Sequence, residues 1–182
     1  MKALRPTLWR TCRVIANTTR LKLLWAIFKS EGLCVNELSD VVGTSRTNTT
    51  NQLRALSARG LITPVRIGKK IVYRAEANHG VDHADELLDA LRKCCARNVS
   101  LREVFRQATA FTHVRRIELV RMLGRGIGID ELSKETGLRY SVLQWNLTKL
   151  QERGFIRDCS GCYIAVRPKN PLGACLSKIV LG

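Results

Sequence analysis

The chain has 182 residues and a net charge of +16, and its 45% apolar and 25% charged residues are typical of a folded protein with one large or two small domains. No apolar run reaches the roughly 18 residues that cross a bilayer, and the N-terminus lacks the apolar core of a signal peptide, so we expect a cytoplasmic protein without a membrane partner. Seven irregularly spaced cysteines do not fit a secreted disulfide framework.

The positive charge is concentrated in two segments. Residues 1–78 carry 14 basic and 4 acidic side chains and residues 108–182 carry 12 and 6, whereas residues 79–107 carry 5 of each. This distribution indicates two modules that face a polyanion, joined by a neutral connector. Generic solubility is the alternative, but it does not require an excess confined to two segments.

Two short helices are expected near the start of the first module. Apolar residues recur with helical spacing over residues 20–28. A second helix is expected from about residue 36 to Gly43, because glycine favours the residue that follows a helix.

A third helix and a hairpin follow. Thr44 or Ser45 can cap the helix, Leu53 and Leu56 form its inner face, and Gly60 ends it. Residues 61–74 form two β-rich stretches around Gly68 and two lysines, which predicts a hairpin. Helix, helix, tight turn, helix and basic hairpin is the order of a winged helix-turn-helix, in which the third helix enters the major groove and the hairpin reaches phosphates.

The outer face of the third helix is rich in Thr, Ser and Asn rather than the Glu and Lys of most solvated helices. These residue types are poor internal helix formers, which favours a role in reading base edges. A solvated face is the alternative. The DNA-binding candidates of the first module, wing included, are Thr44, Ser45, Arg46, Thr47, Asn48, Thr50, Asn51, Arg54, Arg66, Lys69, Lys70 and Arg74.

The pattern then occurs a second time. Residues 51–62 recur as residues 145–156, and Glu37 to Ser39 recur as Glu131 to Ser133 at the same offset. Two copies of roughly 60 residues indicate a pair of similar domains rather than a solenoid.

The second copy has the same order of predicted elements, but the outer face of its third helix and its hairpin differ in composition. Its third helix, expected at 138–147, is more apolar, and its hairpin at 155–167 has Arg157 and Arg167 as its only cations, with Asp158 near the tip. We expect weaker DNA binding, a different half-site or a protein partner. The corresponding DNA-binding candidates are Arg139, Tyr140, Ser141, Gln144 and Trp145.

Four segments of the first copy, residues 17–24, 34–38, 52–61 and 68–73, resemble the ArsR-type winged-helix transcriptional regulators. The resemblance covers this copy almost end to end and extends more loosely over residues 112–166. It implies a homodimeric repressor whose first and last helices form the dimer interface. Because two copies lie in one chain, we infer a monomeric pseudo-dimer, which departs from the family pattern, with further dimerisation left open.

The connector supports this interpretation. Residues 82–97 begin acidic and end basic, as suits a helix dipole, and take the place of the family's dimerising last helix. Ser100 to Glu103 has the capping-box pattern of a further helix, which corresponds to 6–14 at the front of the chain. Residues 171–181 are the expected partner helix of the connector.

We therefore predict a mainly α fold with small β-hairpin wings, built as tandem winged helix-turn-helix domains. The predicted boundaries are 1–80 for the first domain, 81–98 for the connecting helix and 99–182 for the second domain.

The cysteines give no strong metal site. The sensor members of the family resemble one another in a Cys-Val-Cys pair, whereas this chain has Cys34-Val35-Asn36. One thiol does not make a site for a thiophilic ion, so no metal or cofactor is predicted. The weaker thiol candidates are Cys12, Cys34, Cys94, Cys95, Cys159 and Cys162.

The sequence thus predicts a regulator of transcription whose partner is double-stranded DNA. The alternatives are a winged-helix module for protein interaction or dimerisation, with the second domain as the partner surface, and a non-specific architectural DNA-binding protein. No Gly-rich phosphate loop, paired carboxylates or Ser/His/Asp set is evident, which argues against an enzyme.

Overall fold

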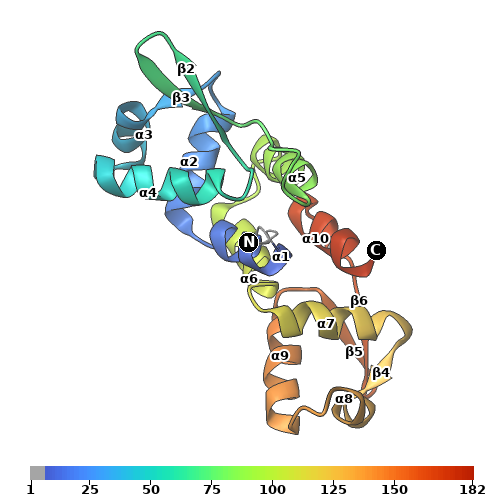
Figure 1. The fold of residues 1–182 in the computed structure, drawn as a ribbon. Helices are drawn as coiled ribbons and strands as arrows, with labels where there is room; N and C mark the ends of the chain where they lie inside the picture. Colours follow the sequence, from blue (N-terminus) through green and yellow to red (C-terminus); the bar gives the residue numbers. More distant parts are fainter. Residues whose placement is uncertain (1–6) are drawn as a thin grey trace.

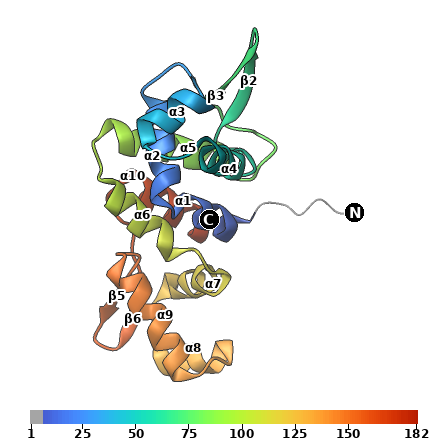
Figure 2. The same cartoon turned by 90° about the vertical axis from the view of Figure 1, so that its left-hand side faces the viewer.

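The computed structural model describes residues 7–182, apart from the side chain of Arg125. It is mainly helical, with two small antiparallel sheets, and none of the described helices is long and apolar enough to cross a bilayer. We call α1 to α5 the first unit and α6 to α10 the second unit. Figures 1 and 2 show α1, α5, α6 and α10 in a central layer, with α2 to α4 and the first hairpin at one end and α7 to α9 and the second hairpin at the other.

The first unit contains α1 (Leu8–Ile15), α2 (Thr18–Phe28), β1 (Leu33–Cys34), α3 (Val35–Val42), α4 (Arg46–Ser57), β2 (Thr63–Ile67), β3 (Lys70–Arg74) and α5 (Ala84–Ala96). The second unit contains α6 (Leu101–Ala110), α7 (Val114–Met122), the 3-10 helix η1 (Leu123–Arg125), β4 (Ile127–Gly128), α8 (Ile129–Thr136), α9 (Tyr140–Glu152), β5 (Ile156–Cys159), β6 (Cys162–Ala165) and α10 (Pro171–Leu181). The predicted front helix at 6–14 is α1, and Pro6 lies outside the described residues.

The helix boundaries of the first unit follow from local hydrogen bonding. Ser45, rather than Thr44, caps α4: its hydroxyl accepts from the Asn48 amide at 3.3 Å. Gly43 takes the left-handed conformation that ends α3. Gly60 has a φ of +66°, and a Cβ built there would lie 2.9 Å from the Cβ of Val81, so both conformation and space require glycine after α4.

Each unit has a three-stranded antiparallel sheet, ordered β1-β3-β2 in the first and β4-β6-β5 in the second. The hairpins lie where the sequence predicts them. The two-residue strands β1 and β4 were not predicted, because their residues show no alternation of their own. They pair with the inner strand of each hairpin, as at Leu33 with Tyr73 and at Ile127 with Tyr163.

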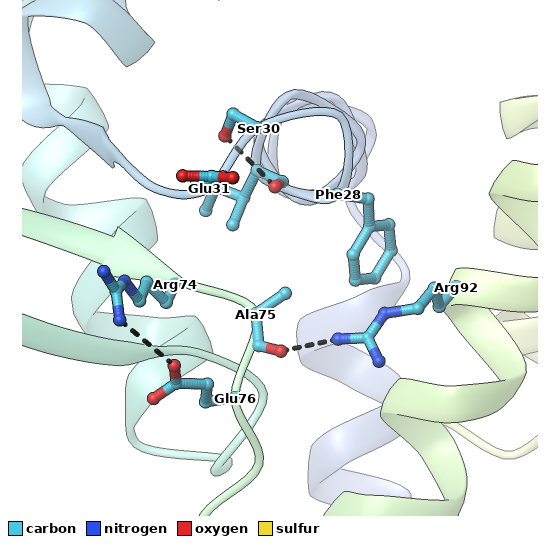
Figure 3. Close-up of a pocket in the computed structure, with 8 residues that line it drawn as sticks. Phe28, Ser30, Glu31, Arg74, Ala75, Glu76 and Arg92 are labelled. Atoms are coloured by element: carbon cyan, nitrogen blue, oxygen red, sulfur yellow. Dashed lines mark hydrogen bonds and ion pairs between the residues drawn. The ribbon is translucent and has the colours of Figure 1, made fainter.

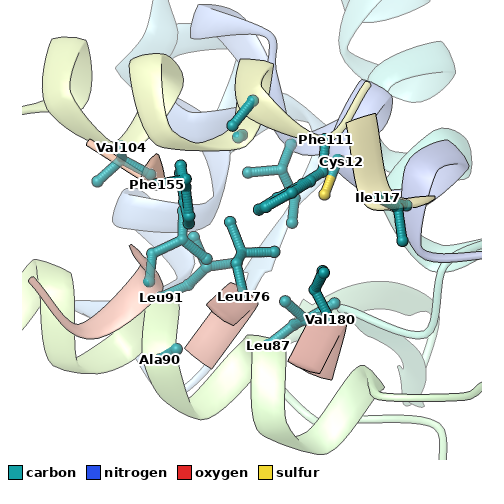
Figure 4. Packing of buried hydrophobic residues seen from close by; sticks show 14 of the residues in the cluster. Cys12, Leu87, Ala90, Leu91, Val104, Phe111, Ile117, Phe155, Leu176 and Val180 are labelled. Atoms are coloured by element: carbon teal, nitrogen blue, oxygen red, sulfur yellow. The ribbon is translucent and has the colours of Figure 1, made fainter. Parts of the chain in front are cut away.

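The central layer joins the units through like pairs of helices. The first helices, α1 and α6, contact each other, and so do the last helices, α5 and α10. Figure 4 shows Leu87 and Leu91 of α5 beside Leu176 and Val180 of α10, all four buried. Residues 171–181 are therefore the partner of the connector helix, as expected.

The predicted capping box at the start of α6 is only half formed. The Ser100 hydroxyl accepts from the Glu103 amide at 3.2 Å. The Glu103 carboxylate instead accepts from Arg106 at 2.8 Å and from Gln107 at 3.0 Å. Two side-chain donors within reach thus compete for the carboxylate that the box would use.

An aromatic pair joins the end of α6 to the start of the second hairpin. Phe111, just after α6, and Phe155, just before β5, are fully buried, with ring centroids 4.6 Å apart in an edge-on arrangement (Figure 4).

We expect Phe155→Ala to lower the free energy of unfolding by about 3–5 kcal/mol, measured by urea denaturation, because it removes this contact and leaves a cavity. The control is Phe105→Ala on the exposed side of α6, with a loss under about 1 kcal/mol. Equal losses in the two variants would contradict this structural role of the pair.

Candidate nucleic-acid interface

The outer face of α4 carries polar side chains that have no hydrogen-bond partner among the described residues. Arg46, Thr47, Asn51 and Arg54 are exposed, and their side chains make no hydrogen bond within residues 7–182. Thr49, Leu53 and Leu56 are fully buried and fix the opposite face. The helix therefore presents a row of donors and acceptors to solvent, which starts with Arg46 and Thr47 at its N-terminus, the part of such a helix that can reach base edges.

Other predicted contacts of α4 are partly used within the protein. The Thr44 and Thr49 hydroxyls lie 2.7 Å apart, and the Thr50 hydroxyl donates to the Arg46 carbonyl at 2.8 Å. Asn48 Oδ1 accepts from Gln52 at 2.9 Å. These side chains position the helix start more than they extend from it.

Two arginines contact α4 and α9 from other helices, and sequence analysis did not identify them. Arg20 donates to the carbonyl of Val14 and, at 2.8 Å, to Gln52 of α4. Its counterpart Arg116 donates to the carbonyl of Ala110 at 2.6 Å, and its guanidinium lies 5.7 Å from the ring of Trp145 on α9. Arg20 and Arg116 occupy corresponding positions in the two copies, and this correspondence is the sequence signal that could have identified them.

The hairpin of the first unit is basic at its tip. Arg66, Lys69 and Lys70 are exposed there, together with the apolar side chains of Ile67 and Ile71. A projecting cationic strand pair is suited to phosphate contacts beside the groove that a recognition helix occupies.

Arg74 does not join the other wing cations. It lies at the base of the hairpin, 3.8 Å from the Glu76 carboxylate, beside a cavity of about 460 Å³ that Phe28 and Arg92 also line (Figure 3). Its Nε is buried with no hydrogen-bond partner in the described part of the chain. The structure therefore turns Arg74 away from the tip where the sequence analysis grouped it.

The corresponding face of the second unit is aromatic. Tyr140 and Trp145 of α9 are 53% and 57% exposed, and Arg139, Ser141 and Gln144 are exposed with them. Trp145 takes the position of Asn51 in the repeat. α9 begins at Tyr140 and continues to Glu152, so the helix starts later and ends later than the predicted 138–147.

The thiols lie in two different settings. Cys12 and Cys94 are buried, with Cys175 of α10 next to them, and burial raises the pKa of all three thiols. Cys175 was absent from the predicted set. Cys34 precedes α3, where its amide donates to Glu37 at 2.7 Å. Cys95 is partly exposed. Within residues 7–182, no group of three His, Cys, Asp or Glu side chains is placed to hold a metal ion.

Comparison with known proteins agrees with this geometry. Residues 17–63, from the N-cap of α2 to the first residue of β2, match the family described as winged helix-turn-helix DNA-binding. The transcriptional repressor SmtB homolog of Synechocystis sp. is 30% identical to this chain over 79 residues, which are 43% of this chain and 59% of that relative. The match thus spans less than two thirds of the relative's length.

The buried thiols generate a prediction about alkaline pH. Burial raises the pKa of Cys175 from 9.0 to about 11, so the folded protein holds this proton where the unfolded chain has lost it. Stability should be complete below pH 9 and fall as the pH rises toward 11. We expect Cys175→Ala to reduce this fall by about 1–2 kcal/mol, less than the full shift gives because the thiol is partly exposed. Urea unfolding measured between pH 8 and 11 checks this, and identical slopes in both proteins would contradict it.

Proposed function

We propose that the protein is a DNA-binding regulator of transcription that reads double-stranded DNA through α4 and holds the adjacent phosphates with the β2–β3 wing. The observation that carries this proposal is the exposed, internally unpaired row of Arg46, Thr47, Asn51 and Arg54. Arginine and asparagine side chains form paired hydrogen bonds with guanine and adenine edges in the major groove. The family match over residues 17–63 and the similarity to a repressor support the same function.

We further propose that the chain acts as a monomeric pseudo-dimer of ArsR type. In a two-fold dimer the same surface of each subunit forms the interface. The first helix of one subunit then packs on the first helix of the other, and the last helix on the last. The contacts of α1 with α6 and of α5 with α10 follow this rule inside one chain. Tandem domains at 1–80 and 99–182, with the connecting helix at 81–98 between them, are consistent with this arrangement.

The second unit favours a second candidate function, a surface for a protein partner. Its recognition helix exposes Tyr140 and Trp145, aromatic types that are enriched in protein interfaces. Its wing has Asp158 near the tip and lacks the lysines of the first wing. The same face could instead read a second, different half-site.

The DNA proposal predicts sequence-dependent losses. After selection of bound duplexes from a random library, Arg46→Ala and Asn51→Ala should each cost about 1–3 kcal/mol on the selected duplex and little on unrelated duplexes, because each removes base contacts. Lys69→Ala should weaken binding to all duplexes alike and reduce the slope of log affinity against log salt concentration by about one. Fluorescence anisotropy at several salt concentrations measures both effects. Equal losses on every duplex from Arg46→Ala would favour non-specific architectural binding.

The second unit supplies a matched pair of variants. Trp145→Ala stands at the repeat position of Asn51→Ala, and both residues are exposed. If the second unit binds DNA, Trp145→Ala should weaken binding to the selected duplex by at least about 1 kcal/mol. An unchanged affinity, alongside a loss from Asn51→Ala, would support the protein-partner function of this face.

A further inference from the structure

The tip of the β5–β6 hairpin carries two thiols directly opposite each other. Cys159 is the last residue of β5 and Cys162 the first of β6, and the two are paired in the antiparallel register. Both are exposed. Ser160 and Gly161 between them have positive φ values of 54° and 90°, the conformation of a tight two-residue turn. The Gly161 amide donates to the Asp158 carboxylate at 3.0 Å, which holds the turn.

This register suits a disulfide. Directly opposed residues of an antiparallel pair have Cα atoms about 4.5–5.5 Å apart, within the range of about 4.4–6.8 Å found in disulfides. The Cβ atoms of such pairs are about 4.5–5.5 Å apart and must approach by up to about 1 Å to form the bond. A solvent-exposed turn can supply that movement.

The two thiols differ from the other cysteines and from the other wing. Cys12 and Cys94 are buried, and Cys34, Cys95 and Cys175 are partly covered. In the first wing the corresponding pair is Ile67 with Lys70. The second wing thus has two accessible sulfur atoms at the place where the first has an apolar and a cationic side chain.

We propose that Cys159 and Cys162 are a reversible oxidation site that closes into a disulfide across the hairpin by exchange with a low-molecular-weight disulfide. One cysteine thiolate attacks the small disulfide, forms a mixed disulfide and releases the first small thiol. The second cysteine thiolate attacks the protein sulfur of the mixed disulfide and releases the second small thiol. Two protein thiols are oxidised and one small disulfide is reduced to two thiols. The site does not depend on DNA binding.

A metal site at the tip is less well supported. A structural zinc ion takes four ligands, usually cysteine and histidine. No third His, Cys, Asp or Glu in the described chain is placed with the two thiols to complete such a site. Oxidation requires only the two sulfur atoms that the register already brings together.

The experiment uses the full chain with oxidised glutathione as the probe. After incubation under native conditions the reaction is stopped with acid, the protein is denatured, and the remaining thiols are alkylated before peptide mass spectrometry. Of the seven cysteines, Cys159 and Cys162 should both escape alkylation. Their peptide should carry no glutathione and should be lighter by two hydrogens than the reduced peptide. Dithiothreitol should restore both thiols.

Single variants separate closure from simple reactivity. In Cys159→Ser or Cys162→Ser the remaining thiol has no partner, so it should stay as a mixed disulfide with glutathione. Cys34→Ser, at a partly covered thiol far from this tip in sequence, should leave closure of the hairpin unchanged. Wild-type protein that keeps glutathione on the hairpin, joins two chains, or keeps both thiols reduced while other cysteines oxidise would overturn the proposal. Serine at these exposed positions removes no buried contact, so folding is retained.

Discussion

The pairing of like helices in the central layer is the constraint on which both units depend. α5 has Leu87 and Leu91 on the face that meets α10, and α10 has Leu176 and Val180 on the face that meets α5. Either unit alone would expose these side chains to water, at a cost of roughly 25 cal/mol for each Å² of apolar surface. The contact of α1 with α6 adds a second like pair. The positions of α4 and α9 follow from these contacts, because the first and last helices of each unit form the central layer.

The two copies show which positions the fold constrains and which it leaves free. Leu53 and Leu56 of α4 correspond to Leu147 and Leu150 of α9, and all four are buried. On the outer face the polar Asn51 corresponds to the aromatic Trp145. A change on the inner face leaves a cavity or a clash, whereas a change on the outer face alters only what the helix presents to a partner. The repeat therefore preserves the scaffold while the surfaces diverge.

Much of the scaffold could be predicted from sequence because its signals are local. The apolar spacing of 20–28, the turn at Gly43 and the glycine-containing hairpin each depend on neighbours in the chain, and each element lies where the pattern placed it. The tail helix was also predictable, since an apolar segment of that length requires a partner.

The remaining features depend on contacts between segments far apart in sequence. β1 and β4 exist only because a hairpin strand pairs with them. Arg74 lies near its fellow wing residues in sequence but turns toward Glu76 at the hairpin base. Cys175 lies with Cys12 because α10 folds back across the layer, which no spacing of cysteines could indicate. The DNA-contact role of the α4 face stays a prediction, because exposure alone does not identify what a side chain touches.

Joining both units in one chain changes how such a protein would meet its target. A homodimer must first find its second subunit, and below its dissociation constant it separates into halves that bind weakly. Here the contacts between like helices are intramolecular, so a single molecule arrives with both faces already set at a fixed spacing. The outer faces of α4 and α9 also differ, so the two ends of the molecule are not equivalent. If both faces contact a duplex, as proposed for the pseudo-dimer, the complex has one orientation, and a substitution on one face alters only one end of it.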